Sequence, residues 1–464
     1  MKIFKIWIII FIMILFEYNY VSAITIKEEE KLSKEVMKVV FNRFELIRDP
    51  SIVNYVEGIG DKILSTLPPQ PFVYQFYVIK EPVYNAFATP AGHIFINSGI
   101  IQAMDSEEQL AGILAHEIAH VVCRHISQKI ERDKKINLAT LAGVAAGVLL
   151  GSKGSGAASN ALTIGSVAAG ASMTLAYSRE DEMQADTLGI SYLSKAGYSP
   201  KGLLTILKKM RDKQWFGPKE IPTYLMTHPA IEDRIAYISS CNELNRKYPK
   251  ISSYDFDIAN IRLCALYEDE NGAMQRFKAK ILNTPYDFLS NYGYALILAR
   301  NGNRKDAVSY LKKALEKRAF DPFVLSDLGR LYFVDGKYKE ALTVLENSMN
   351  IGQSNPETDF YLARTQMETG NYSEAIDTFN RLIDKEKDYS KAYYFLGDIY
   401  GKQGNTPFAH YYLGIYYYMQ PNQRLALFHL SHALKGMTDS EKKQKINEML
   451  KEIEVPPGHP LRPQ

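Results

Sequence analysis

Four glycines recur at intervals of 34 residues in the C-terminal part of the chain: Gly302, Gly336, Gly370 and Gly404. An alanine follows each glycine by five residues, and a small residue precedes each by seven. This period is typical of a helix–turn–helix unit that stacks on copies of itself, because one unit alone cannot bury its apolar face. The glycine suits the turn and the small residues suit a close helix crossing. The pattern therefore predicts a helical solenoid.

The repeat resembles the tetratricopeptide repeat (TPR). The resemblance covers residues 287–420, and degenerate units are expected at 255–286 and 422–453. We therefore expect a TPR α-solenoid over residues 255–453 and a disordered tail over 454–464. Such a solenoid offers a concave groove to peptides or partner proteins. Tyrosines concentrate in its last third, and those not needed in the core would suit apolar or β-prone client segments.

The N-terminus has the pattern of a secretory signal peptide. Lys2 and Lys5 precede the apolar run Ile6–Phe16, and Val21-Ser22-Ala23 provides small residues for cleavage. Eleven apolar residues are short of the roughly twenty that span a bilayer, which disfavours the alternative of an uncleaved anchor. We expect residues 1–23 to be removed and the protein to be exported to the periplasm.

Two short segments together predict a metal site. His116 and His120 are four residues apart, so on a helix they point the same way and can hold one zinc ion, with Glu117 beside them as a base. Glu182 lies sixty-two residues after His120 and can be the third ligand that a catalytic site needs. Asp186 is one turn further along and could hydrogen-bond a ligand imidazole.

These segments resemble the HtpX and CAAX-prenyl-protease family of zinc metallopeptidases. The resemblance rests on His116–His120, Tyr177–Gly189, Asn85–Gly99 and Thr227–Arg234, in the order of the family. It implies a mainly α gluzincin domain with a small β-sheet over residues 24–250, one Zn²⁺ per chain, ligands His116, His120 and Glu182, and catalytic Glu117. It also implies supporting roles for Asp186, His228 and Arg234.

The elements around the motifs can be placed in outline. Helices are expected at 28–48, 51–67, 179–196, 200–213 and 231–248, with strands at 72–80, 86–89 and 93–97. Ser106 should cap a metal helix that runs to Arg132. The stretch Gly92–Ser98 is expected to be an edge strand that binds an extended substrate through main-chain hydrogen bonds. We assign substrate binding to these residues: Asn85, Phe87, Gly92, Ile94, Phe95, Ile96 and Arg234.

Some features leave alternatives open. The apolar segment 138–176 is expected to be either a buried helical hairpin or a lid with peripheral membrane contact. Cys123 is expected to be a structural thiol rather than a ligand, and a Cys241–Cys264 pairing stays undecided. His228 has two functional interpretations. It could stabilise the oxyanion of the tetrahedral intermediate, or it could occupy the fourth zinc position and hold the enzyme inactive.

The whole pattern predicts an exported zinc endopeptidase that cleaves unfolded or misassembled proteins. The combination of export signal, peptidase domain and C-terminal repeats is similar to that of periplasmic proteases in the quality control and assembly of outer-membrane β-barrel proteins. This similarity implies that the TPR groove binds clients or the outer-membrane assembly machinery. The alternative is a chaperone or assembly scaffold whose peptidase activity is minor or held off. A net charge of +3 argues against nucleic acid.

Overall fold

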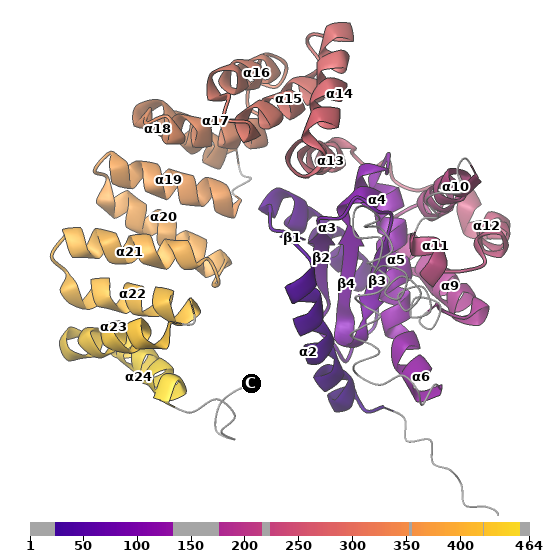
Figure 1. Ribbon diagram of the computed structural model, residues 1–464, viewed down its shortest axis with the longest axis horizontal. Coiled ribbons are helices and arrows are strands. Elements are labelled where there is room, and N and C mark those ends of the chain that lie inside the picture. The colour runs from indigo at the N-terminus through magenta and orange to yellow at the C-terminus, as the bar shows by residue number, and fades with distance from the viewer. Residues whose placement is uncertain (1–23, 133–175, 216–222, 352–354, 421, 455–464) are drawn as a thin grey trace, which may run out of the picture. The chain divides into compact units, whose positions relative to one another are not determined.

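The computed structural model describes residues 24–132, 176–215, 223–351, 355–420 and 422–454. The chain divides into two compact units, one ending at Leu263 and the other beginning at Cys264 (Figure 1). The expected signal peptide, the apolar segment 138–175 and the tail from residue 455 lie outside the described residues.

The first unit combines helices with one small sheet, as expected. Its elements are α2 (Ile26–Arg43), β1 (Leu46–Ile47), α3 (Pro50–Leu64), β2 (Gln75–Ile79), β3 (Ala86–Thr89), η1 (Pro90–Gly92), β4 (His93–Asn97), α4 (Ser98–Gln102), α5 (Glu107–Val122), α6 (His125–Arg132), α9 (Arg179–Lys195), α10 (Lys201–Trp215), α11 (Thr223–Thr227), α12 (Ile231–Ser240) and η3 (Asn242–Asn245). The predicted helix 231–248 is therefore too long, because the chain becomes extended at Cys241.

The strand order in the sheet is β1-β2-β4-β3. β4 pairs in parallel with β2 and antiparallel with β3, so it is an interior strand. The expectation that Gly92–Ser98 forms the sheet edge is therefore wrong. The edge next to β4 is β3, which also lies against α5. The sequence could not reveal this, because β3 and β4 are both short and apolar.

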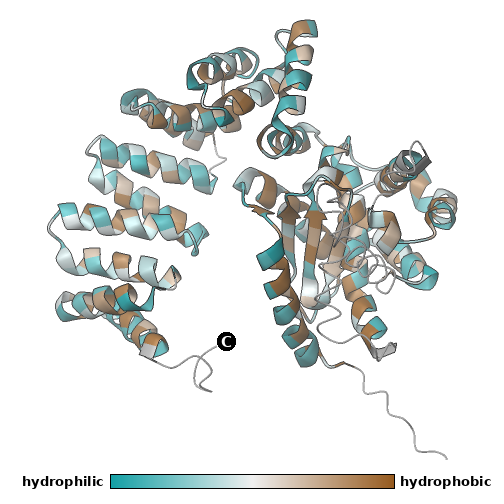
Figure 2. Cartoon of the chain, viewed as in Figure 1, coloured by the Kyte–Doolittle hydropathy of each residue, from teal (hydrophilic) through white to brown (hydrophobic). Residues whose placement is uncertain are grey.

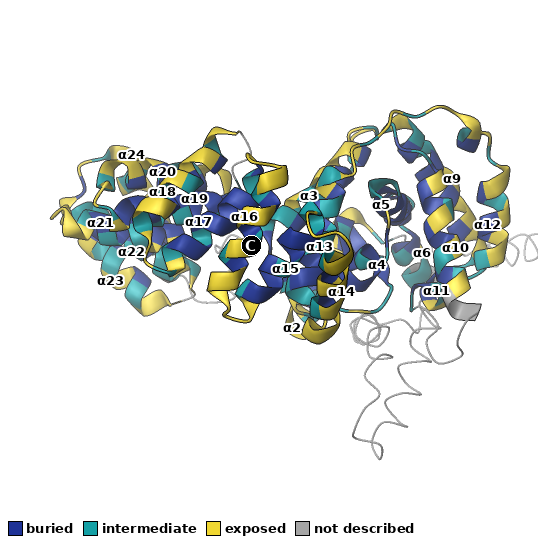
Figure 3. Cartoon of the chain, turned by 90° about the horizontal axis from the view of Figure 1, so that it is seen from above, coloured by how far each residue is buried: buried dark blue, intermediate teal, exposed yellow. Residues whose placement is uncertain are grey.

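Helices lie against the sheet, whose strands are largely hydrophobic (Figure 2). Val36, Met37 and Val40 of α2 pack on Ile79 and Phe95 of the strands. On α5, every residue from Gln109 to Val121 is buried (Figure 3). α5 also approaches α10 closely, because a Cβ at Gly112 would lie 2.8 Å from the backbone of Leu203. This packing fixes α5 in the centre of the unit.

The metal helix is shorter than predicted. It ends at Val122 rather than at Arg132, because Arg124 has a left-handed backbone with φ 53° and α6 starts at His125. Such a conformation is costly for a residue with a Cβ, so other contacts must hold it. The buried carboxylate of Glu29 on α2 accepts the Arg124 Nε–H at 2.7 Å, and Arg124 also donates to the carbonyl of Ile24.

The start of α13 (Tyr254–Tyr267) makes its contacts with residues of the first unit. Arg262 forms a buried ion pair with Asp49, with its two nitrogens 2.7 and 2.9 Å from Oδ2. Asn260 donates to the carbonyl of Ile101, and Gln102 donates to the carbonyl of Leu263. Residues beyond 250 therefore complete the packing of the peptidase unit.

The second unit consists of helix pairs, as the 34-residue period predicts. They are α14 (Glu270–Asn283), α15 (Phe288–Arg300), α16 (Arg304–Lys317), α17 (Pro322–Val334), α18 (Tyr338–Asn350), α19 (Pro356–Glu368), α20 (Tyr372–Lys385), α21 (Ser390–Lys402), α22 (Thr406–Met419), α23 (Gln423–Gly436) and α24 (Ser440–Glu454). The four repeat glycines have φ from 73° to 84°, which explains why glycine ends the first helix of each pair.

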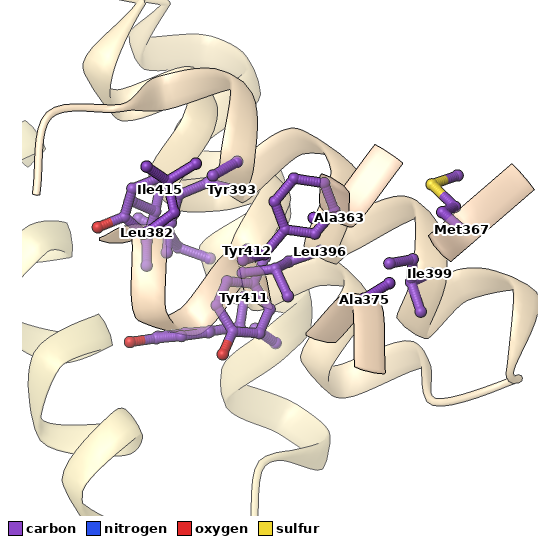
Figure 4. Close-up of a cluster of buried hydrophobic side chains, with 14 of the residues drawn as sticks. Ala363, Met367, Ala375, Leu382, Tyr393, Leu396, Ile399, Tyr411, Tyr412 and Ile415 are labelled. Atoms are coloured by element: carbon purple, nitrogen blue, oxygen red, sulfur yellow. The ribbon is translucent and has the colours of Figure 1, made fainter. Parts of the chain in front are cut away.

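Close crossings explain the small residues of the repeat. A Cβ at Gly329 would lie 2.5 Å from Leu345, so a larger residue would push the paired helices apart. In the last repeats Tyr393, Tyr411 and Tyr412 are buried with Leu396 and Ile415 in one core cluster (Figure 4). Other tyrosines, including Tyr394 and Tyr418, are exposed. The tyrosine-rich segment therefore serves both the core and the surface.

Candidate metal centre

Helices α5 and α9 bring three of the predicted ligands together. The Nε2 atoms of His116 and His120 are 3.0 Å apart. The carboxylate of Glu182 lies 3.5 Å from His116 Nε2 and 3.4 Å from His120 Nε2. α9 starts in a capping box at Ser178, which sets Glu182 in its first turn. All three side chains are buried.

His228 completes this group. It follows α11, and its Nδ1 lies 3.0 Å from Glu182 Oε1 and 3.3 Å from His116 Nε2. One ligand atom from each of His116, His120, Glu182 and His228 lies within 4.8 Å of the others. His228 thus lies where a fourth ligand would be. The interpretation in which His228 occupies the fourth zinc position and holds the enzyme inactive requires this position.

Two charged residues, Asp186 and Arg234, contact the zinc ligands and hold them in position. Asp186 Oδ1 lies 2.9 Å from His116 Nδ1, as the spacing of Asp186 from Glu182 predicts. Arg234 makes two bonds of 2.8 Å to Asp186 and pairs with Glu182 at 2.7 Å. Burial opposes the charge of Glu182, but Arg234 and His228 outweigh it and hold the pKa of Glu182 well below its usual value. Arg234 is itself buried, so its assignment to substrate binding is wrong and its contacts are with the centre.

His125 is a site residue that the sequence reasoning missed. Its Nδ1 lies 2.9 Å from Nδ1 of His120, and its Nε2 lies 3.0 Å from Oε1 of Gln184 on α9. When His120 presents Nε2 to a metal, its Nδ1–H donates to His125, and His125 donates in turn to Gln184. A continuous helix to Arg132 would not place His125 here. Only the left-handed residue Arg124 returns it to the centre.

Glu117 lies beside this centre but is not placed as a ligand. It is buried, and neither carboxylate oxygen has a hydrogen-bond partner among the described residues. His228 lies beside it, with Nε2 3.6 Å from Glu117 Oε1. Burial is the main cause that raises the pKa of Glu117, which suits a group that must accept and return a proton. The rings of Tyr177 and Tyr224 flank the site by stacking on His120 and His228.

The predicted substrate-binding residues fall into different places. Ile94, Phe95 and Ile96 are buried within β4 and belong to the core, so their assignment to substrate binding is wrong. Gly92 has φ 91° in the turn before β4. Asn85 and Phe87 lie at the edge strand β3. The Asn85 amide is buried, and neither of its polar atoms has a hydrogen-bond partner among the described residues.

The donor set fits zinc. Imidazole nitrogens and one carboxylate are typical zinc ligands, and their outer partners fix the orientation of both α5 histidines. His228 Nε2 also has no hydrogen-bond partner among the described residues, although it is buried. Cys123 is not part of the group, and no disulfide joins Cys241 to Cys264.

Residues 51–242 match peptidase family M48. The chain carries an M48 peptidase domain. Metallopeptidases of this family use zinc, in agreement with the four-residue centre in this domain. Residues 292–348 and 332–399 match tetratricopeptide repeats, so a TPR region follows the M48 domain.

Several curated relatives match the chain over different lengths. A beta-barrel assembly-enhancing protease of Escherichia coli (strain K12) is 26% identical over 392 residues, which cover 81% of this chain and 77% of that protein. The protease of the same name from Yersinia pestis is 24% identical over 363 residues, covering 78% and 74%. Mitochondrial metalloendopeptidase OMA1 of Schizosaccharomyces pombe is 29% identical over 205 residues, covering 44% and 57%. The chain is therefore a metallopeptidase that is homologous to proteins of this kind.

Within the part of the chain that the structure describes, none of the helices combines the length and apolar character that a bilayer crossing requires.

Proposed function

We propose that this chain is an exported zinc endopeptidase that cleaves unfolded or misassembled proteins during assembly of outer-membrane β-barrel proteins, with His116, His120 and Glu182 as zinc ligands. The observation that carries the proposal is the buried centre, in which the possible ligand atoms lie within 4.8 Å of one another and Glu117 stands beside them. A purely structural zinc site would have no need for an adjacent carboxylate without a partner.

Each residue of the site has a different role in the proposed reaction. Zinc, when bound, polarises the scissile carbonyl and lowers the pKa of a water molecule towards about 7. Glu117 accepts the proton of this water and then delivers it to the leaving amine. Asp186 and His125 hold the two α5 imidazoles in the tautomer that offers Nε2 to the centre. Arg234 compensates the negative charge of Glu182 and Asp186.

An extended substrate would bind along the edge strand β3. The outer edge of a terminal strand can pair with a further strand, and unfolded β-barrel precursors provide such strands. Asn85, immediately before β3, is buried in this closed arrangement, and its amide, which has no partner among the described residues, would bind the substrate main chain once the site opens. Recognition of main chain rather than side chains implies loose sequence specificity.

The position of His228 favours a closed resting state. Its imidazole takes the place that substrate or water needs, and the entire group is buried. We infer that the loop containing His228 must move before cleavage, so that activity is held off until a client binds. This resting state also accommodates the second candidate function, a chaperone or assembly scaffold with little proteolysis, in which the TPR region binds clients or the assembly machinery.

Two measurements separate these functions. Casein cleavage by the exported protein, with and without a chelator, reports on the peptidase activity. Crosslinking in cells, with Glu117→Gln to retain clients that would otherwise be cut, identifies the bound proteins. Chelator-sensitive cleavage together with captured outer-membrane β-barrel precursors supports the proposal. Capture without any cleavage, even after His228→Ala, would leave the scaffold function.

A further inference from the structure

Three of the nine histidines in the chain lie together in the repeat unit, apart from the peptidase centre. His410 is on α22, and His429 and His432 are on α23. The Nδ1 atoms of His410 and His429 are 2.9 Å apart, and the ring of His432 stacks on that of His410 with centroids 5.2 Å apart. His432 is exposed, and the other two are partly buried.

The repeat pattern does not require histidine at these positions. The residues that correspond to His410 in the three preceding repeats are all aliphatic: Val308, Leu342 and Ile376. The residues that correspond to His429 are Asp327, Tyr361 and Phe395. In the preceding repeat, Ile376 and Phe395 both pack against the buried core cluster. The last repeat step therefore places facing imidazoles where the step before it has apolar packing.

Both facing imidazoles are kept neutral. Burial, followed by the neighbouring histidines, lowers the pKa of His429 to about 4, and burial also lowers the pKa of His410. A neutral imidazole has one nitrogen with a free lone pair, and this is the form that binds metal ions. Neither ring has another hydrogen-bond partner among the described residues, whereas the buried His125 is also bonded to Gln184.

The distances suit a shared ion. Two imidazole nitrogens on one tetrahedral zinc, each at 2.0–2.1 Å, are about 3.3 Å apart. The 2.9 Å between His410 and His429 is within a few tenths of an ångström of that value. His432 donates from Nδ1 to the carbonyl of Phe428, which leaves the lone pair on Nε2. These ligand atoms are less tightly grouped than those of the buried centre, so the exposed His432 side chain would have to move and give up its bond to Phe428 to complete the group.

We propose that His410, His429 and His432 form a second metal site, which takes a borderline divalent transition ion such as Zn²⁺ with water in the fourth position. Imidazole ligands suit zinc, copper and nickel rather than calcium or magnesium. The ion ties α22 to α23, two helices that otherwise meet through side-chain packing. It thereby fixes the position of α23, which carries the exposed Phe428, relative to α22.

Zinc stoichiometry of the full chain tests the site. The protein, with its peptidase centre loaded, is dialysed against free Zn²⁺, and bound zinc is measured by elemental analysis. The decisive variant combines His410→Ile with His429→Phe, which restores the side-chain types of the preceding repeat and so preserves packing. His93→Phe is the matched control, because it removes a histidine that contacts Tyr77 in the first unit.

The unmodified chain and His93→Phe are expected to take up a second zinc equivalent, and the double variant is expected to lose it. Zinc should also slow amide exchange in α22 and α23 of the unmodified chain but not of the double variant. Cleavage activity should be equal in all three proteins. A second equivalent that persists in the double variant, or that is missing from the unmodified chain, would overturn the proposal.

Discussion

Replacement of His125 tests whether a residue outside the zinc motifs controls the metal centre. His125→Leu removes the acceptor that lies 2.9 Å from His120 Nδ1 and leaves a buried N–H without a partner. An unsatisfied buried donor costs about 1–3 kcal/mol, and each 1.4 kcal/mol is about a factor of ten. We therefore expect the zinc dissociation constant to rise by about 5- to 150-fold.

The assay is competition for zinc with a chromophoric chelator, with turnover at saturating zinc measured in parallel. His125→Asn is the matched control, because its side-chain oxygen can replace the Nδ1 acceptor. It should recover most of the affinity. The reasoning fails if His125→Leu binds zinc as tightly as the unmodified chain, or if His125→Asn is as weak as His125→Leu. Circular dichroism of both variants checks that the fold is retained.

Four further changes have defined outcomes. Glu117→Gln should abolish cleavage while about one zinc stays bound at the centre, as elemental analysis would show, because Glu117 is not a ligand. His228→Ala should raise basal cleavage and self-cleavage at unchanged zinc content; a loss of about 10²–10³-fold in turnover would instead indicate an oxyanion donor. Asn85→Ala should raise KM for an unfolded substrate without changing zinc content; an unchanged KM would remove Asn85 from the substrate site. A chain that ends at residue 250 should be about 3–5 kcal/mol less stable in urea than one that ends at residue 268, because it lacks Arg262 and leaves the buried Asp49 unpaired; equal midpoints would contradict this.

The sequence predicted best what depends on local spacing. The 34-residue spacing of the glycines predicted where the helix pairs of the repeat unit lie, because few residues other than glycine adopt a left-handed turn conformation. The four-residue interval between His116 and His120 fixed their common direction on α5. Glu182 and Asp186 followed from the same helical geometry on α9.

What the sequence could not predict depends on contacts between distant segments. Glu29 holds Arg124 in place just after the end of α5, although the two residues are 95 positions apart in the sequence. The position of His125 beside the centre could therefore not be predicted from the sequence. The interior position of β4 depends on its pairing with both β2 and β3, and strand composition alone does not give the order of a sheet. Arg234 was expected both to support the site and to contact substrate, and the local sequence does not show whether an arginine is exposed or buried.

The residues of the metal centre come from α5, from α9, from the segment after α11 and from α12, so the centre is complete only when all of these have folded together. A newly made chain that has folded only as far as α9 lacks His228 and Arg234, so two carboxylates remain without their buried cation. Such a chain would position its zinc ligands less firmly, because Arg234 does not yet hold the carboxylates of Glu182 and Asp186 in place. Maturation is therefore complete only when residues 223–240 have joined the unit.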